Sequence, residues 1–276
     1  MTVSPSYSVL MPLAPWEPAG QVAAALESLA RQSLPCSQVV VSCDGPPPPA
    51  LQSVLQASGL PLIQVVGPGG EGVGPVLSRG LVACKEDLVV RADADDLSLP
   101  ERCAVQVEAM EARPQLVALS TPILEFISSP QSLCSERPAP VGYGALRRRS
   151  RWRNPLNHPA VILRRGAVLA IGGYRHCPGF EDYDLWLRLL HTGALLDNLD
   201  QPLVLARVGS DHLARRRGLG YLRKEWHFLI GCGRLGTLSW WQVGVLFALR
   251  CPVRLIPAWC QQQLTLWMLR SKPALD

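Results

Sequence analysis

One stretch of the chain, Leu88–Arg102, constrains the fold more than any other. Its short apolar run passes within a few residues into three carboxylates, Asp93, Asp95 and Asp96. An apolar run bounded by polar residues is typical of a buried strand, so we expect the acids where a strand leaves an open α/β sheet, the usual ligand crevice of such sheets. Three carboxylates this close repel one another unless a cation holds them, and Mg²⁺ binds a few carboxylates together with phosphate oxygens. The stretch predicts a metal–diphosphate site, although an isolated Asp-x-Asp is more often a solvated acidic turn.

Short apolar runs alternate with helical patterns on both sides of this stretch. Strands are expected over 7–13, 38–42, 61–66 and 88–90, with helices over 16–32, 51–57 and 75–84 between them. Beyond the acids we expect helices over 101–112 and 183–190, strands over 116–120, 123–127, 160–164 and 202–207, and a mobile loop or lid over 128–143. Alternating strands and helices favour βαβ units and a mostly parallel sheet, which places the chain in the α/β class.

Composition excludes several classes of protein. The 276 residues are 48% hydrophobic and 18% charged, which suits one or two compact domains, and the net charge of +5 is too small to argue for nucleic acid as a partner. Nine cysteines without a Cys-x-x-Cys pair indicate neither a disulfide framework nor a zinc site, and favour a reducing cytosol. We see no signal peptide and no stretch apolar enough to span a bilayer, so a cytoplasmic location is expected.

Two long motifs, in this order, make the chain resemble glycosyltransferase family 2. The first is Val90–Arg102, Val-Arg-Ala-Asp-Ala-Asp-Asp-Leu-Ser-Leu-Pro-Glu-Arg, and the second is Gly172–Leu190, which contains Gly-Gly-Tyr-Arg and Glu-Asp-Tyr-Asp-Leu-Trp-Leu-Arg-Leu-Leu. The resemblance runs from about Ser8 to Arg217. It implies a Rossmann-like GT-A fold, a mostly parallel central sheet with flanking helices, and an inverting enzyme of the bacterial polysaccharide type. It also implies a nucleotide diphosphate sugar as donor and Mg²⁺ or Mn²⁺ as cofactor.

The resemblance assigns donor and metal roles to residues of the first half. Asp95 is expected to bind the metal together with Asp93, which also holds the ribose or sugar of the donor, and Asp96 is an additional candidate. Pro12 belongs to the opening strand beside the nucleotide. The cation would neutralise the diphosphate leaving group, where negative charge develops.

Asp44 matches the end of the family's Asp-Asp-Gly-Ser turn, where an acid binds the nucleotide base. The chemistry fits because an ionised carboxylate only accepts hydrogen bonds and a base such as uracil offers an N–H. Cys43 and Pro46 depart from the family pattern, which leaves the identity of the base open. The alternative role of Asp44 is a local Asx turn.

Two arginines and one histidine are further candidates on the donor side. Arg79 lies in Gly72–Leu81, which resembles the family's Gly-rich entry to a helix, and Arg91 directly precedes the acids. A guanidinium there would orient carboxylates or bind phosphate, and a structural salt bridge is the alternative for each arginine. Many relatives carry a metal- or diphosphate-contacting His where this chain has Gly209, so His212 is the candidate third metal ligand.

Glu181 and Asp182 form a second acidic centre. Inverting transfer is a single displacement, in which a carboxylate must remove the proton of the attacking hydroxyl. By resemblance Asp182 is this base, and Glu181 binds or orients the acceptor. Asp184 and Trp186 on the same predicted helix and His158 are acceptor-side candidates. For Asp184 we prefer a helix-start role, because the helix dipole favours acids there, and a satisfied structural His is the alternative for His158.

The chain is expected to divide into a nucleotide-sugar-binding half (1–100), an acceptor-binding half (101–212) and a helical tail (213–276). The tail alternates apolar segments with single arginines and aromatics, and Gly and Pro break it into short pieces. Amphipathic helices in a membrane interface fit this pattern, and a hairpin packed on the catalytic domain or on a second subunit is the alternative. A glycan or polyprenyl-diphosphate-linked acceptor and a peripheral position on the cytoplasmic face of the inner membrane are therefore expected. The arginine run 147–153 could bind such a diphosphate or form a solvated face.

Two other functions compete with this interpretation. A nucleotidyltransferase also uses paired acids beside an α/β sheet, but it gives no role to Glu181 and Asp182. A non-catalytic nucleotide-sugar-binding or membrane scaffold protein is compatible with the departures at Cys43, Pro46 and Gly209. Both acidic motifs together favour the glycosyltransferase.

Overall fold

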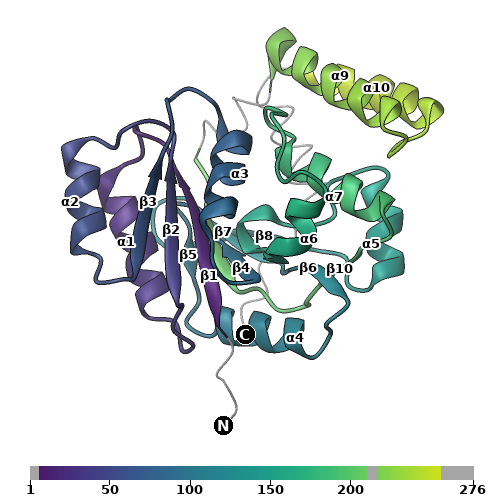
Figure 1. Ribbon diagram of the computed structural model, residues 1–276. Helices are drawn as coiled ribbons and strands as arrows, with labels where there is room; N and C mark the ends of the chain where they lie inside the picture. Colours follow the sequence, from purple (N-terminus) through teal and green to yellow (C-terminus); the bar gives the residue numbers. More distant parts are fainter. Residues whose placement is uncertain (1–5, 210–216, 256–276) are drawn as a thin grey trace.

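The computed structural model describes residues 6–209 and 217–255 and is built on a seven-stranded sheet with the strand order β10-β6-β9-β4-β1-β2-β3 (Figure 1). The strands are β1 (Tyr7–Leu13), β2 (Gln38–Cys43), β3 (Leu62–Val66), β4 (Leu88–Arg91), β6 (Leu116–Ser120), β9 (Ile162–Arg164) and β10 (Leu195–Asn198). All pair in parallel except β9, which runs antiparallel to both of its neighbours. The predicted α/β class with a mostly parallel sheet is confirmed. Strand β10 was not predicted, because its sequence Leu-Leu-Asp-Asn is short and half polar.

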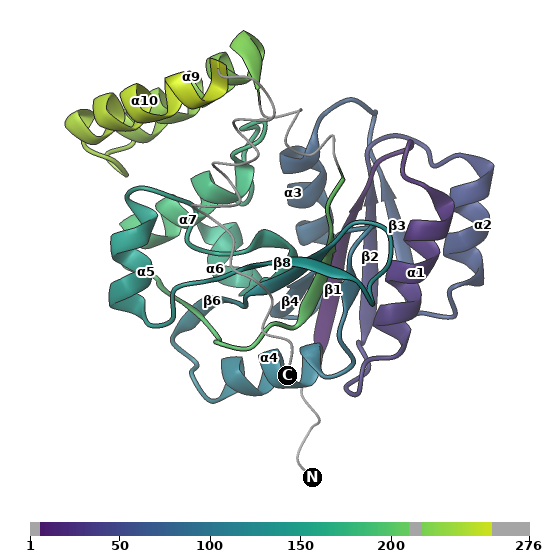
Figure 2. The ribbon, with the colours of Figure 1, turned by 180° about the vertical axis from the view of Figure 1, so that it is seen from behind.

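Side chains of the central strands alternate between two layers of core, as the twofold period of a strand requires. On β1, Val9 and Met11 pack on one face of the sheet, whereas Leu10 packs on the other. The first face is covered by α1 (Ala19–Ala30), α2 (Pro49–Ala57) and α4 (Arg102–Glu111), and the second by α3 (Val73–Ala83), α5 (Tyr143–Ser150), α6 (Arg165–Ala170) and α7 (Glu181–His191). Figures 1 and 2 show these helices from opposite sides.

A second, four-stranded sheet lies beside the acidic stretch. Its order is β5-β11-β7-β8, with the bounds β5 (Leu97–Ser98), β7 (Ile123–Phe126), β8 (Leu133–Arg137) and β11 (Val204–Arg207). The prediction of a loop or lid over 128–143 is therefore wrong for its central part, because β8 pairs antiparallel with β7. The buried carboxylate of Glu125 on β7 accepts hydrogen bonds from Ser135 (2.5 Å) and Arg137 (2.6 Å) of β8. These polar contacts fix the hairpin, which explains why hydrophobic periodicity did not reveal it.

The tail forms two helices, α9 (Gly218–Arg234) and α10 (Trp240–Leu255), which lie side by side (Figures 1 and 2). Four glycines lie within α9 and Pro252 lies inside α10, so these residues do not end the helices. Phe228 of α9 stacks on Phe180 with ring centroids 4.6 Å apart and contacts Tyr183 of α7. The two helices thus pack as a hairpin on the start of α7. No helix in the described part of the chain is both long and apolar enough to cross a membrane.

Candidate active site

The acidic stretch turns sharply at the carboxyl end of β4, where the sequence placed it. Oxygen atoms of Asp93, Asp95 and Asp96 lie within 4.8 Å of one another. Hard divalent cations prefer oxygen ligands of this kind, so the donor set fits Mg²⁺ or Mn²⁺ better than a softer metal. Across residues 6–209 and 217–255, this is the one group of acidic, His or Cys side chains that gathers closely enough to hold an ion.

Burial and mutual repulsion both act on these acids. Burial, followed by the charge of Asp93, raises the pKa of Asp95, and the same two causes raise the pKa of Asp96 further. Asp96 also accepts a hydrogen bond from the backbone nitrogen of Arg207 at 2.8 Å, which ties β11 to the acidic turn. A bound cation would offset the repulsion between the carboxylates. This is the physical reason why the cluster fits a metal.

Arg91, the last residue of β4, holds Asp93 in place. Its guanidinium donates hydrogen bonds to both carboxylate oxygens of Asp93, and its side chain is buried. A bidentate pair of this kind fixes the plane of a carboxylate, which a lysine could not do. Arg102, fully buried beneath it, donates to the carbonyl oxygens of Arg91 (2.7 Å) and Pro159 (3.0 Å). Arg91 therefore orients an acid, the first of the two roles considered from sequence.

A hollow of about 260 Å³ lies against the acidic turn and brings together four of the predicted donor residues. Pro12, Asp44, Asp93 and Asp95 all line it. Its walls come from the carboxyl ends of β1, β2 and β4 and from the start of α3, which is the expected ligand crevice of such a sheet. The hollow is the natural place for a donor that must reach both Asp44 and the acids.

Asp44 is buried and fixes the loop that leads into α3. Its carboxylate accepts hydrogen bonds from the backbone nitrogens of Glu71 (3.0 Å) and Gly72 (3.3 Å). Arg79 supports the same loop from behind, through an ion pair with Glu71 at 2.5 Å and a hydrogen bond to the carbonyl oxygen of Cys43 at 3.2 Å. Arg79 does not line the hollow. The structure thus shows the salt bridge that was the alternative, and a donor role for Arg79 stays a prediction.

Glu181 and Asp182 begin α7, and the loop before this helix packs on the donor side of the site. A Cβ atom on Gly74 of α3 would lie 2.3 Å from the carbonyl oxygen of Arg175 and 3.5 Å from Cβ of Glu181. Only glycine permits this close approach of α3 to the loop. The second acidic centre is therefore in direct contact with the helix that borders the donor hollow.

Asn154 is a polar contact of Asp182 that sequence reasoning missed. Its side-chain nitrogen donates to Oδ2 of Asp182 at 2.5 Å, and its own Oδ1 accepts from the backbone nitrogen of Leu156. The signal was present as the Asn-Pro pair that follows the arginine run, but such a pair indicates only a turn. The contact orients the carboxylate of Asp182 from the far side of the site.

The two carboxylates at the start of α7 titrate as a pair. Burial, followed by the charge of Asp182, raises the pKa of Glu181 to about 7. Glu181 also accepts a hydrogen bond from the backbone nitrogen of Gly179 at 2.8 Å. Glu181 therefore changes its protonation near neutral pH, since burial and the adjacent carboxylate both disfavour its charged form.

The predicted acceptor-side residues lie deeper than the two acids. His158 is buried, and its Nε2 lies 3.0 Å from the hydroxyl oxygen of Tyr174. Burial, with a smaller contribution from Arg91, lowers the pKa of His158 well below its usual value, so the imidazole is neutral. Trp186 is fully buried and meets His158 edge-on, with ring centroids 6.0 Å apart. Trp186 therefore lies in the core and contacts His158 there.

Asp184 is turned away from Asp182. Its Oδ2 accepts from Nε of Arg188 at 2.8 Å, and both side chains are nine-tenths buried. Arg188 in turn donates to the carbonyl oxygens of Ile171 (2.9 Å) and Gly173 (2.7 Å). Asp184 thus holds the turn that precedes the loop of the second centre. His212, the candidate third metal ligand, lies outside the described residues.

Comparison with known proteins agrees with this geometry. The model of the family described as glycosyl transferase family 2 matches residues 17–171, more than half of the chain. The amylovoran biosynthesis glycosyltransferase AmsE of Erwinia amylovora is 34% identical over 79% of this chain and 82% of its own. An Escherichia coli UDP-Gal:alpha-D-GlcNAc-diphosphoundecaprenol beta-1,3-galactosyltransferase is 29% identical over 92% of this chain and 93% of its own.

A solved structure confirms the fold. The mannosyltransferase PcManGT from Pyrobaculum calidifontis, in complex with GDP-Man and Mn²⁺, superposes with a TM-score of 0.58 at 19% identity, over 97% of this chain and 82% of that one. At this identity the likeness concerns the fold alone. The family match and the similar biosynthetic enzymes carry the rest of the assignment. The chain belongs to glycosyl transferase family 2 and is a nucleotide-sugar glycosyltransferase of the bacterial polysaccharide type with the GT-A fold.

Proposed function

We propose that the enzyme transfers a sugar with inversion from a nucleotide diphosphate sugar to a hydroxyl of a polyprenyl-diphosphate-linked glycan. The observation that carries the proposal is the contact of the second acidic centre with α3, the helix whose start lines the donor hollow: Gly74 of α3 abuts Arg175 and Glu181. The half formed by residues 1–100 binds the donor, and the half formed by residues 101–212 presents the acceptor. A nucleotidyltransferase would need the first centre but not the second.

Asp182 is the general base in this proposal. Its carboxylate accepts the proton of the acceptor hydroxyl while that oxygen forms its bond to the anomeric carbon. The bond from the anomeric carbon to the diphosphate oxygen breaks on the opposite face, so the configuration is inverted. Asn154 holds the base in orientation through a hydrogen bond of 2.5 Å. A positioned carboxylate of this kind is what abstraction of the acceptor's proton requires.

Mg²⁺ or Mn²⁺ fits the first centre, with Asp95 and Asp93 as ligands and His212 as a proposed third. When bound, such an ion supplies positive charge to the diphosphate leaving group. Arg91 prepares the site for it, because its bidentate hold on Asp93 fixes one ligand in advance. The Mn²⁺ in the mannosyltransferase complex of the same fold supports this choice of ion.

A peripheral position on the cytoplasmic face of the inner membrane completes the proposal. A similar Escherichia coli enzyme acts on an undecaprenol-linked acceptor, and a substrate of that kind is confined to a membrane. The outer face of α10 supports the same location, since Trp241, Val245, Leu249 and Leu255 are exposed at helical spacing. Aromatic and aliphatic side chains in this arrangement are typical of helices that lie in a membrane interface.

The decisive experiment replaces Asp182 with Asn, which keeps the size of the side chain and removes the base. We expect Asp182→Asn to lower transfer by at least about a thousandfold, given the typical contribution of a general base and of the ionised carboxylate, while donor binding changes less than twofold. The measurement pairs release of nucleoside diphosphate with calorimetric titration of UDP-, GDP- and dTDP-sugars in the presence of Mn²⁺. Asp200→Asn, the same change at an exposed acid, is the control. Equal loss of transfer and donor binding would refute the assignment of the base.

The same assay tests the metal. EDTA, or Asp95→Ala with Mn²⁺ present, should abolish transfer and weaken donor binding, because the diphosphate loses its counter-charge. Unchanged activity in EDTA would refute the metal. Release of pyrophosphate in place of nucleoside diphosphate would favour nucleotidyl transfer, and binding without turnover across a broad panel of acceptors would favour a non-catalytic role for this site.

A further inference from the structure

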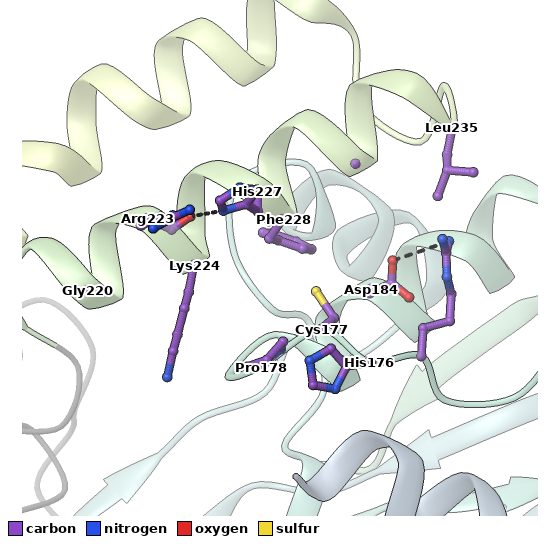
Figure 3. A pocket seen from close by; sticks show the side chains of 12 residues that line it. His176, Cys177, Pro178, Asp184, Gly220, Arg223, Lys224, His227, Phe228 and Leu235 are labelled. Atoms are coloured by element: carbon purple, nitrogen blue, oxygen red, sulfur yellow. Dashed lines mark hydrogen bonds and ion pairs between the residues drawn. The ribbon is translucent and has the colours of Figure 1, made fainter. Parts of the chain in front are cut away.

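A second cavity, separate from the donor hollow, lies between the loop before α7 and the helix α9 (Figure 3). It measures about 490 Å³, and no residue that lines it also lines the donor hollow. Figure 3 shows Lys224 of α9 extending toward the loop that carries His176 and Pro178, while His227 lies back along α9 toward Arg223. Neither the donor nor the metal has a use for this cavity, so it calls for a ligand of its own.

The charges around this cavity are strongly unbalanced. Arg175, Arg223 and Lys224 line it. Neither Arg223 nor Lys224 has an acidic partner among the described residues, and both are exposed. Cations that converge on a hollow without counter-charges create a positive potential there, which favours an anion.

Neither Asp184 nor Cys177, which also line the cavity, offsets the positive charge of its arginines and lysine. Asp184 is the one acid that lines the cavity, and Arg188 pairs with it at 2.8 Å while Arg175 lies 4.0 Å from it. Burial raises the pKa of the Cys177 thiol to about 12, so it stays protonated and neutral. The cavity therefore keeps the net positive charge of its basic residues.

The rest of the lining is apolar. Phe228, Leu235 and Pro178 contribute hydrophobic surface beside the cations. A small free anion needs only the cations, whereas a phosphate group that carries a hydrocarbon chain uses both kinds of surface. The lining thus fits an amphiphilic phosphate or diphosphate ester.

The cavity also lies close to the catalytic base. Asp184 lines the cavity and comes two residues after Asp182 in α7. Two residues rise about 3 Å along a helix, and their side chains point to opposite sides of it. The loop 175–178 forms one wall of the cavity, and its first residue contacts α3 at the donor hollow. A glycan attached to a group held here needs only to pass the first turn of α7 to bring a hydroxyl to Asp182.

We propose that this cavity binds the diphosphate of the lipid-linked acceptor, a diphosphate ester of a long-chain alcohol, through Arg223, Lys224 and Arg175. The proposal rests on the proposed function, since it names the part of the enzyme that recognises the acceptor's lipid end. Arg223 and Lys224 bind the diphosphate oxygens, and Phe228 and Leu235 contact the first units of the alcohol. The sugar is then presented to the base from a fixed anchor, which favours transfer by orientation.

The test uses farnesyl diphosphate, a soluble diphosphate ester that carries no sugar, with the full-length enzyme in calorimetric titration. We expect it to bind the wild type, and expect the double variant Arg223→Gln/Lys224→Gln to bind it at least about tenfold more weakly, since two charge-assisted contacts are lost. Farnesol and inorganic pyrophosphate should each bind more weakly than the ester. Arg234→Gln, the same change on an exposed residue of α9 outside the cavity, should have less than a twofold effect.

Kinetics separate this proposal from the proposed function. With a diphosphate-linked acceptor the double variant should raise KM at least about tenfold, while with a neutral alkyl glycoside of the same sugar its KM and kcat should match the wild type. Equal farnesyl diphosphate binding by wild type and double variant would overturn the proposal. A double variant that no longer binds phosphatidylglycerol vesicles but binds farnesyl diphosphate as the wild type does would also overturn the proposal. That result would assign the cavity to a phospholipid headgroup. Absence of transfer to every acceptor would refute the proposed function, while the titration would still decide the cavity.

Discussion

At the scale of single residues, the site depends on polar side chains that hold other polar side chains. Arg91 fixes Asp93, Asn154 contacts Asp182, and Asp96 binds the backbone of Arg207. Each of these contacts fixes an acid of one of the two acidic centres against a neighbouring side chain or backbone group. A buried polar group without a partner costs about 1–3 kcal/mol. The site therefore combines fixed geometry with charges whose removal from water disfavours the folded state.

Glu181 shows this cost as a dependence of stability on pH. Its folded pKa of about 7 lies above the usual value of 4.5, so the folded state binds the proton more tightly than the unfolded state. The contribution to stability is complete below about pH 4.5 and is lost as the pH rises to about 7. Since one pKa unit corresponds to about 1.4 kcal/mol, Glu181→Gln should gain roughly 2–3 kcal/mol over the wild type between these limits. Urea unfolding of both proteins from pH 4.5 to 8 measures this difference, and a difference that is constant with pH would contradict it.

Candidate site residues could be predicted where a sequence motif contains them. They could not be predicted where a residue joins the site through a single contact. The acids at 93–96 and 181–182 were found from sequence, because carboxylates gather there and two motifs occur in order. Asn154 was missed because one amide in a turn has no periodicity and its partner is 28 residues away. Trp186 has the apolar spacing of its helix, and the structure places it in the core beneath His158. Spacing alone does not distinguish a side chain that touches a ligand from one that supports it.

At the scale of elements, one buried acid joins α9 to α10, and Arg250 joins this hairpin to the rest of the domain. Glu225 of α9 is fully buried, and its carboxylate accepts from Arg250 at 3.0 Å and from Arg254 at 2.8 Å. Arg250 also donates to the carbonyl oxygen of Trp152 at 2.6 Å, two residues before Asn154. The tail is thus connected to the segment that contacts Asp182.

We expect Glu225→Gln to loosen this hairpin and to leave the sheet intact. The change leaves two arginines without their counter-charge, and breaking a buried ion pair costs about 3–5 kcal/mol. Hydrogen exchange should speed up in α9 and α10 and remain unchanged in β1, β2 and β4. Glu108→Gln, the same change on an exposed face of α4, is the control. Unchanged exchange in both helices would show that packing of Phe228 on Phe180, and not the ion pairs, holds the hairpin.

Apart from β10, the strands of the central sheet followed the sequence pattern, because they are short apolar runs. Strand β8 and the helix α5 did not, since β8 is held by Glu125, Ser135 and Arg137, and α5 ends in an arginine run that resembles a solvated surface. The second sheet depends on pairing between residues 97–98 and 204–205. A strand of two residues that pairs with a segment more than 100 residues away in the chain leaves no signal in the local sequence.

At the scale of the whole molecule, the described tail presents a surface with two kinds of side chain. The outer face of α10 exposes Trp241 (62%), Leu249 (63%) and Leu255 (55%). On α9, Arg223 and Lys224 are exposed, whereas its one acid is buried. The central sheet, by contrast, buries nearly all of its large apolar side chains. An apolar stripe flanked by cations suits the surface of an anionic bilayer better than it suits water.

This surface predicts how the protein partitions between water and lipid. With vesicles containing phosphatidylglycerol, the wild type should cosediment, and added salt should weaken but not abolish binding, because screening acts on the cations and not on the apolar stripe. Trp241→Ser/Leu249→Ser should remove most of the remaining binding at high salt, and Val66→Ser on exposed β3 should not. Concentration-dependent association of the wild type without vesicle binding would instead assign the stripe to a second copy of the chain. Since a lipid-linked acceptor never leaves the bilayer, a stripe that holds α10 at its surface also places the cavity beside α9 where that acceptor lies.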